Sequence, residues 1–308
     1  MNMATNKPLI ITASEMLIDI DILSCALAYR KLLSLRGITT KVVLPGSLTS
    51  SVTDIVRGWN FTYETALEGS PEDFSYVLVD ISEPDQFAKF VVLDNIIELY
   101  DHRHGFENFW KERLGDKAKI ELIGACATLI WEEYKKAGLE NKIDTLNANL
   151  LYTAILSNTL NLQAQITSPR DKNALDELSG HIDLPDNWRQ IYFDEVSKEI
   201  LSYPVVSMEN DTKKVDINNT KYIIIQLELW NSHKFIEDNY GTIIKVLNKH
   251  KNNFTFLTSP SISEGFNYIV ATNDTVKNKL QSCIGVDWDV DIGKTKKLWL
   301  RKEIIRLL

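Results

Sequence analysis

Acidic side chains and one histidine stand where short apolar runs of the chain end. Asp80 follows the run YVLV directly, and Asp101 and His102 follow IIELY. Asp19 and Asp21 lie between the first apolar run and the amphipathic stretch after it. Carboxylates with an occasional imidazole are the ligands that hard divalent cations prefer. These residues predict a metal cluster if the fold brings them to one edge.

Each of these residues also has a purely structural interpretation. Asp21, just ahead of a helical pattern, suits the N-cap position of that helix. Asp80, before Ile-Ser-Glu-Pro, suits a turn. His102 is then an ordinary surface histidine. The pattern by itself leaves both interpretations open.

The elements that must position these residues alternate along the first half of the chain. We expect strands over residues 9–11, 41–44, 76–79 and 96–100. We expect helices over residues 22–35, 84–91, 107–114, 125–137, 148–162 and 171–178. Such alternation predicts a doubly wound, mostly parallel α/β sheet, in which ligands bind outside the carboxyl ends of the strands.

The second half of the chain follows a different pattern. Residues 180–187 (GHIDLPDN) are polar, contain Gly and Pro, and predict a linker. Beyond them we expect strands over residues 222–229, 254–257 and 268–271, and a helix over residues 235–249. The prediction is a domain over residues 1–182 followed by a smaller α/β domain over residues 188–308.

Composition limits the classes of partner. The 308 residues suit two domains, and the formal net charge of −8 comes without a run of Lys and Arg. This argues against a protein that coats nucleic acid and against one that binds a membrane surface, but not against a small phosphate-containing substrate held by local cations.

Three cysteines, of which Cys25 and Cys126 lie in apolar patterns, predict buried thiols. We therefore expect a cytoplasmic protein.

Six short motifs follow one another along the chain. They are IDIDILSCALAY, VLVDIS, LYDHRHGF, LIGACATLIWE, LLYTAILSNTLNL with TSPRDKNALDEL, and a terminal LRKEII. In this order they resemble the DHH phosphoesterase superfamily, and more narrowly its branch with a second, DHHA2-type domain. That branch contains the manganese-dependent (family II) inorganic pyrophosphatases, the short exopolyphosphatases and the prune proteins. The resemblance covers nearly the whole chain and implies a DHH domain followed by a DHHA2-like domain.

The resemblance implies a site for two Mn²⁺ ions, or for Mg²⁺ or Co²⁺. Asp19 would bind one ion and Asp21 the other, while Asp80 would bridge them. His102 would be a ligand of the second ion, with Asp101 behind it as its partner. Two such ions lower the pKa of a bridging water and neutralise charge on the phosphate that it attacks.

The resemblance also implies cations that bind phosphate. Arg301 and Lys302 match an Arg-Lys pair of the family, and Lys213 matches its phosphate-binding lysine. The alternative for the pair is a solvated charged surface near a terminus. For Lys213, the adjacent Lys214 is an equal candidate.

Several positions depart from the family's motifs. Glu15 stands near the place of a missing His or Asn ligand, where it either replaces that ligand or leaves the position empty. Arg103 replaces the second His of Asp-His-His, as in prune proteins, and can still contact a phosphate oxygen; His104 is a second candidate for the missing histidine. Asn158 stands where an aspartate ligand is expected, and its amide oxygen coordinates a cation without supplying charge.

Three functions follow from these residues. The first is a divalent-metal-dependent hydrolase that releases phosphate from short polyphosphate or pyrophosphate, with Asp80, His102 and Arg103 at the reaction centre. The second is a phosphodiesterase acting on a cyclic nucleotide or a short oligonucleotide. The third is a degenerate, largely non-catalytic homologue that binds metal, phosphate or a partner protein. A homodimer is compatible with all three.

Overall fold

A computed structural model describes residues 7–250 and 254–308 of the chain. The described chain divides into two compact units. The first unit comprises the chain up to Leu162 together with Ile166–Trp188. The second comprises Gln163–Gln165 and the chain from Arg189 to Leu308. Each unit has its own sheet and its own core.

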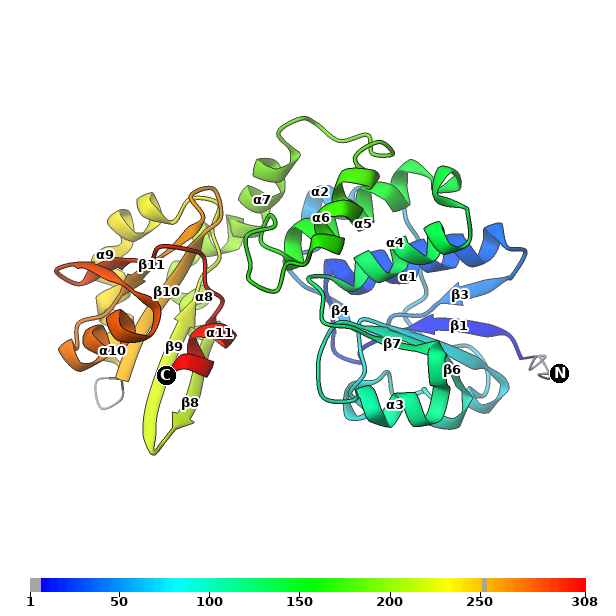
Figure 1. Cartoon of the computed structure of the whole chain (residues 1–308), viewed down its shortest axis with the longest axis horizontal. Coiled ribbons are helices and arrows are strands. Elements are labelled where there is room, and N and C mark those ends of the chain that lie inside the picture. Colours follow the sequence, from blue (N-terminus) through cyan, green and yellow to red (C-terminus); the bar gives the residue numbers. More distant parts are fainter. Residues whose placement is uncertain (1–6, 251–253) are drawn as a thin grey trace. The chain divides into compact units, whose positions relative to one another are not determined.

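A parallel sheet forms the centre of the first unit (Figure 1). Its strand order is β3-β1-β5-β6-β7, and all of its pairings are parallel. The strands are β1 (Leu9–Thr12), β3 (Thr40–Val42), β5 (Ser75–Val79), β6 (Ile96–Asp101) and β7 (Ala118–Ile120). A separate short parallel pair joins β2 (Leu17–Ile18) and β4 (Ser47–Leu48). Strand β5 is buried throughout, as its continuous apolar run predicts for a covered parallel sheet.

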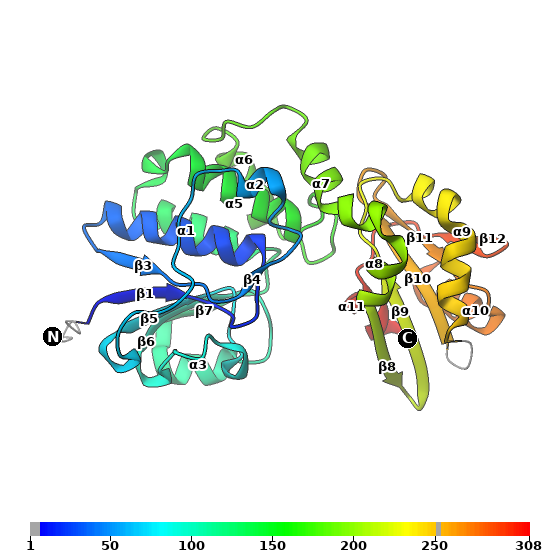
Figure 2. The ribbon, with the colours of Figure 1, turned by 180° about the vertical axis from the view of Figure 1, so that it is seen from behind.

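Helices cover both faces of this sheet (Figures 1 and 2). One face carries α1 (Ile20–Leu35), α4 (Cys126–Lys136), α5 (Thr145–Asn158) and α6 (Pro169–Leu178), whereas α3 (Glu107–Leu114) covers the other. A one-turn helix, α2 (Asp54–Arg57), follows β4. The arrangement confirms the predicted doubly wound α/β fold.

The strand order defines where a ligand binds in such a sheet. From β1 the chain passes first to β3 on one side and later to β5 on the other, so the order reverses between β1 and β5. A reversal of this kind opens a crevice at the carboxyl ends of the strands. Asp80 is the first residue after β5, and Asp101 is the last residue of β6.

The second unit has a mixed sheet of order β12-β13-β11-β10-β9-β8. Its strands are β8 (Thr212–Ile217), β9 (Thr220–Gln226), β10 (Phe254–Ser261), β11 (Phe266–Val270), β12 (Asp287–Asp289) and β13 (Ile292–Lys294). Its helices are α7 (Trp188–Ser202), α8 (Pro204–Asn210), α9 (Ser232–Asn248), α10 (Asp274–Ile284) and α11 (Arg301–Leu307). Successive residues of β9 point to opposite faces, so Ile225 packs in the core under α8 and α9 and Ile224 in the core under α10 and α11.

Two predicted helices differ from the structure. The helix over residues 84–91 is wrong: only a 3-10 turn, Pro84–Gln86, forms there. The backbone after this turn pairs with the loop after β1 instead, since the N–H of Ala88 donates to the carbonyl of Ala13 at 3.0 Å. The helix predicted over residues 148–162 runs from Thr145 to Asn158, because residues 160–162 have positive φ angles.

Candidate metal centre

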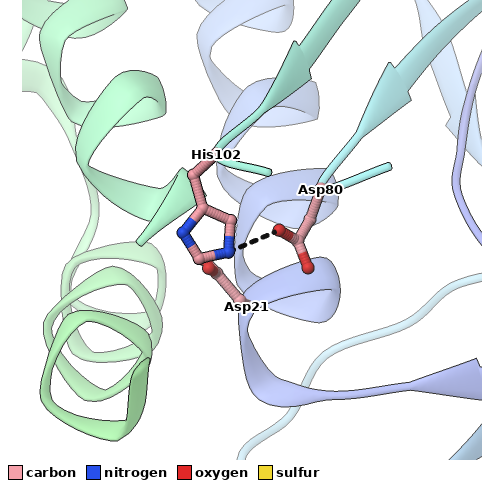
Figure 3. Close-up of side chains that lie close together, drawn as sticks. All are labelled: Asp21, Asp80 and His102. Carbon is pink, nitrogen blue, oxygen red and sulfur yellow. Dashed lines mark ion pairs between the residues drawn. The ribbon is translucent and has the colours of Figure 1, made fainter. Parts of the chain in front are cut away.

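Asp21, Asp80 and His102 converge at the carboxyl edge of the first unit's sheet (Figure 3). One ligand atom from each residue lies within 4.8 Å of the other two. Asp21 and Asp80 are 0% and 1% exposed, and the side chain of His102 is 9% exposed. Within residues 7–250 and 254–308 this is the one group of three His, Cys, Asp or Glu side chains so arranged.

Asp21 is fixed by the beginning of helix α4. The backbone N–H groups of Cys126 and Ala127 donate to its two carboxylate oxygens at 2.9 and 2.8 Å. The positive end of a helix dipole favours a carboxylate at this position. The interpretation of Asp21 as an N-cap is wrong, because Asp19 caps α1 by accepting the N–H of Ile22 at 2.9 Å.

Asp80 is turned toward the cluster by its backbone. Its φ angle is +53°, in the left-handed region, and its N–H donates to the carbonyl of Tyr100 at 2.8 Å. Its Oδ2 accepts a hydrogen bond from Nη2 of Arg103 at 2.9 Å, whereas its buried Oδ1 has no hydrogen-bond donor. Burial raises the pKa of the Asp80 carboxyl well above its usual range. A buried acceptor without a donor is costly, and a cation at Oδ1 removes that cost.

The imidazole ring of His102 directs a nitrogen lone pair toward Oδ1 of Asp80. Its Nδ1 lies 3.1 Å from the carbonyl oxygen of Ile123 and donates to it. Nε2 is therefore unprotonated in the neutral ring, and it faces Asp80 Oδ1 at 3.3 Å. Two acceptors at this distance need a proton or a cation between them. Two carboxylates and one imidazole therefore fit a divalent metal ion.

Asp101 plays a different part from the one predicted. Its Oδ1 accepts the backbone N–H groups of His102 and Arg103, at 2.7 and 3.3 Å, and does not orient the imidazole ring. The carbonyl of Ile123 does so instead. Sequence reasoning missed Ile123, because a backbone carbonyl can come from any residue type.

Glu15 and His104, two of the predicted substitute ligands, are not part of the group formed by Asp21, Asp80 and His102. Glu15 accepts the N–H of Lys89 at 2.9 Å and pairs with its Nζ at 3.3 Å, so both of its carboxylate oxygens have partners. His104 pairs with Glu107 at 2.6 Å. Asn158 is the last residue of α5, and its amide donates to the carbonyl of Ala154 at 3.4 Å.

Three of the predicted phosphate-binding cations lie in the second unit, and the fourth, Arg103, lies in the first. Lys213 is exposed on β8 rather than in a loop, and Lys302 is exposed on α11. Arg301 donates from Nη1 to the carbonyl of Asp211 at 2.5 Å and forms an ion pair with the Asp211 carboxylate. The guanidinium of Arg301 is thus partly committed inside its own unit.

Curated relatives of this chain include proteins named as probable manganese-dependent inorganic pyrophosphatases. A probable manganese-dependent inorganic pyrophosphatase of Listeria welshimeri is 23% identical over 267 residues, which are 84% of this chain and 81% of that protein. One of Lactobacillus helveticus is 27% identical over 164 residues, 52% of this chain and 51% of that protein. The chain therefore spans about half the length of the first curated relatives that it matches. No family model matches it.

Two solved structures share the fold. A putative family II inorganic pyrophosphatase of Methanococcus jannaschii has a TM-score of 0.62 at 18% identity, covering 96% of each chain. An exopolyphosphatase-related protein of Bacteroides fragilis has a TM-score of 0.52 at 12% identity, covering 98% of this chain and 90% of that one. The fold is thus that of family II pyrophosphatases. Together with the relatives above, these matches confirm the resemblance to the DHH superfamily seen in the sequence motifs.

No helix in the described part of the chain is both long enough and apolar enough to cross a membrane.

Proposed function

We propose that this protein is a divalent-metal-dependent hydrolase of phosphoanhydride bonds, with Mn²⁺ as its metal and pyrophosphate or short polyphosphate as its substrate. The observation that carries the proposal is the convergence of Asp21, Asp80 and His102 around an acceptor atom without a donor. The names of the similar proteins support the metal and the substrate class.

In this proposal each residue of the centre has a defined role. Asp21, Asp80 and His102 hold the cation. When bound, such an ion lowers the pKa of a coordinated water and neutralises charge on a phosphate oxygen. Arg103, which is 48% exposed beside Asp80, binds a phosphate oxygen of the substrate. The carbonyl of Ile123 keeps the imidazole in the tautomer that leaves Nε2 open.

The remaining assignments are also proposals. Residues 1–182 form the metal-binding domain, and residues 188–308 form a DHHA2-like domain that binds phosphate through Lys213, Arg301 and Lys302. Asn158 is an additional neutral ligand, since an amide oxygen suits a hard cation.

Phosphate release tests the proposal. The purified chain is assayed with Mn²⁺ on pyrophosphate, tripolyphosphate and long-chain polyphosphate, beside the variant Asp80→Ala and the exposed control Asp94→Ala. We expect release that falls at least 100-fold in Asp80→Ala and is unchanged in Asp94→Ala. No release by the unmodified chain, or release that Asp80→Ala retains, would contradict the proposal. In the first case, turnover of a cyclic nucleotide or short oligonucleotide would favour the phosphodiesterase alternative.

A further inference from the structure

The two oxygens of the Asp80 carboxylate face different partners. Oδ1 lies 3.3 Å from Nε2 of His102, at the cluster shown in Figure 3. Oδ2 accepts a hydrogen bond from Nη2 of Arg103 at 2.9 Å. A carboxylate that bridges two metal ions in the two-oxygen mode gives one oxygen to each ion. Here one of these oxygens is already bound to a guanidinium.

A second carboxylate, that of Asp101, helps to hold Arg103 at Oδ2 of Asp80. Its Nε lies 4.0 Å from Oδ1 of Asp101, and the same Oδ1 accepts its backbone N–H at 3.3 Å. A guanidinium keeps its charge at every pH at which proteins fold. A second divalent ion at Asp80 Oδ2 would face this fixed positive charge across a carboxylate that is itself buried, and the two like charges would repel each other.

Asp19 and Glu15, which the family resemblance offers as further ligands, lie outside the group formed by Asp21, Asp80 and His102. Oδ1 of Asp19 accepts the N–H of Ile22 as the N-cap of α1, and both carboxylate oxygens of Glu15 contact Lys89. The hydroxyl of Ser14 accepts the N–H of Met16 at 3.2 Å. In the portion of the chain that the structure describes, the metal-ligating group contains no fourth His, Cys, Asp or Glu.

We propose that the guanidinium of Arg103 takes the place of a second metal ion, so that the centre binds one divalent cation at Asp21, Asp80 and His102. This inference rests on the proposed function and replaces the two-ion site that the family resemblance implies. The planar guanidinium suits phosphate oxygens, so the substrate's phosphoryl group is bound by one metal ion and one arginine.

The number of manganese ions per chain tests this assignment without reference to activity. The full chain, Arg103→His and Arg113→His are dialysed against Mn²⁺, and bound metal is measured by elemental analysis and electron paramagnetic resonance. Arg113 is a matched control, since it lies in the same unit and pairs with a single exposed carboxylate, Asp94. We expect one ion and the spectrum of an isolated Mn²⁺ in the unmodified chain and in Arg113→His. Arg103→His, with a second imidazole and no fixed charge, is expected to bind two ions with a spin-coupled spectrum.

Three outcomes would overturn the inference, and they are distinguishable from one another. Two ions in the unmodified chain would show that Arg103 excludes nothing, while leaving the proposed function intact. One ion in both the unmodified chain and Arg103→His would show that Arg103 is not what limits the count. No bound ion in the unmodified chain would remove the metal centre itself and, with it, the proposed function. If Arg103→His fails to fold, Arg103→Gln removes the charge with a shorter polar side chain and is expected to bind a second ion weakly.

Discussion

Asp80 is unfavourable for the stability of the fold in two respects, and it is also the residue to which metal binding is assigned. Its carboxylate is buried beside other acidic groups, which raises its pKa, and Arg103 offsets only part of that cost. Residues held in such unfavourable settings are concentrated at functional sites. The left-handed φ angle of Asp80 adds a second local cost at the same position. Both costs fall on the residue to which the metal is assigned.

Glu228 in the second unit gives a prediction of pH-dependent stability. Burial, reinforced by the charge of Asp211, raises the pKa of Glu228 from 4.5 to about 7. The unfolded chain ionises this carboxyl first as the pH rises. The free energy of unfolding therefore falls between about pH 4.5 and pH 7, and the stability that is present at lower pH stays lost above that range.

Replacing Glu228 with Gln removes this ionisation but keeps an acceptor for Gln226, whose amide donates to it at 2.7 Å. We expect Glu228→Gln to raise the free energy of unfolding at pH 8 by about 1–2 kcal/mol and to change it little at pH 4. Urea unfolding at the two pH values measures the difference. Glu209→Gln is the control, because Glu209 is an exposed carboxylate that pairs with a lysine, Lys249, and the variant is expected to show no such pH dependence. Equal effects of Glu228→Gln at both pH values would be evidence against the raised pKa.

At the scale of elements, the beginning of α4 connects the core of the first unit with its metal centre. Asp171, the third residue of α6, is fully buried and accepts the N–H of Gly124 at 2.9 Å and the hydroxyl of Thr128 at 2.7 Å. This ties α6 to α4. The first two residues of α4, Cys126 and Ala127, donate their backbone N–H groups to the carboxylate of Asp21. A substitution that disturbs the contact between α6 and the beginning of α4 should therefore displace Asp21 and weaken metal binding.

Gly124→Ala tests that connection. An added Cβ would lie 2.5 Å from Cγ2 of Thr159 and 2.8 Å from Oδ2 of Asp171, so a neighbour must move. We expect a loss of about 1–3 kcal/mol in the free energy of unfolding, together with weaker Mn²⁺ binding. Gly180→Ala is the control, since its nearest neighbour would be the Glu177 carbonyl oxygen at 3.6 Å. Calorimetry and Mn²⁺ titration of both variants measure the effects. Equal stability of the two variants would contradict this account of the contact between α6 and α4.

The sequence predicts four of the five strands of the first sheet, all but β7, and the edge where the metal ligands meet. It does so because β5 and β6 are mostly apolar runs and parallel strands bring their carboxyl ends together. It does not predict β8, whose residues TKKVDI are mostly polar. Nor does it predict the bond from Arg103 to Asp80 or the carbonyl of Ile123, because a side-chain rotamer and a backbone oxygen leave no pattern in residue type.

At the scale of the whole molecule, the proposal places the metal ligands and Arg103 in the first unit and three further phosphate-binding cations in the second. The metal ligands fall within residues 21–102 of the first unit, next to Arg103, whereas Lys213, Arg301 and Lys302 belong to the second. Substitution of a cation in the second unit should therefore weaken substrate binding without changing metal content.

Lys302→Ala provides this test. We expect the KM for tripolyphosphate to rise about tenfold, equivalent to ~1.4 kcal/mol, with the number of bound Mn²⁺ ions unchanged. Lys249→Ala is a suitable control because Lys249 is an exposed lysine of the second unit that pairs with Glu209. Steady-state kinetics and elemental analysis measure the two quantities. A KM equal to that of the control would exclude Lys302 from substrate binding.

A crystal grown with Mn²⁺ and measured at the manganese absorption edge would locate the ion directly. We predict one anomalous peak bonded at about 2.0–2.6 Å to carboxylate oxygens of Asp21 and Asp80 and to Nε2 of His102. The Arg103 guanidinium should remain on the other oxygen of Asp80. A map with no peak at these three residues, at a manganese concentration that supports phosphate release, would contradict the assignment of this cluster as the metal centre.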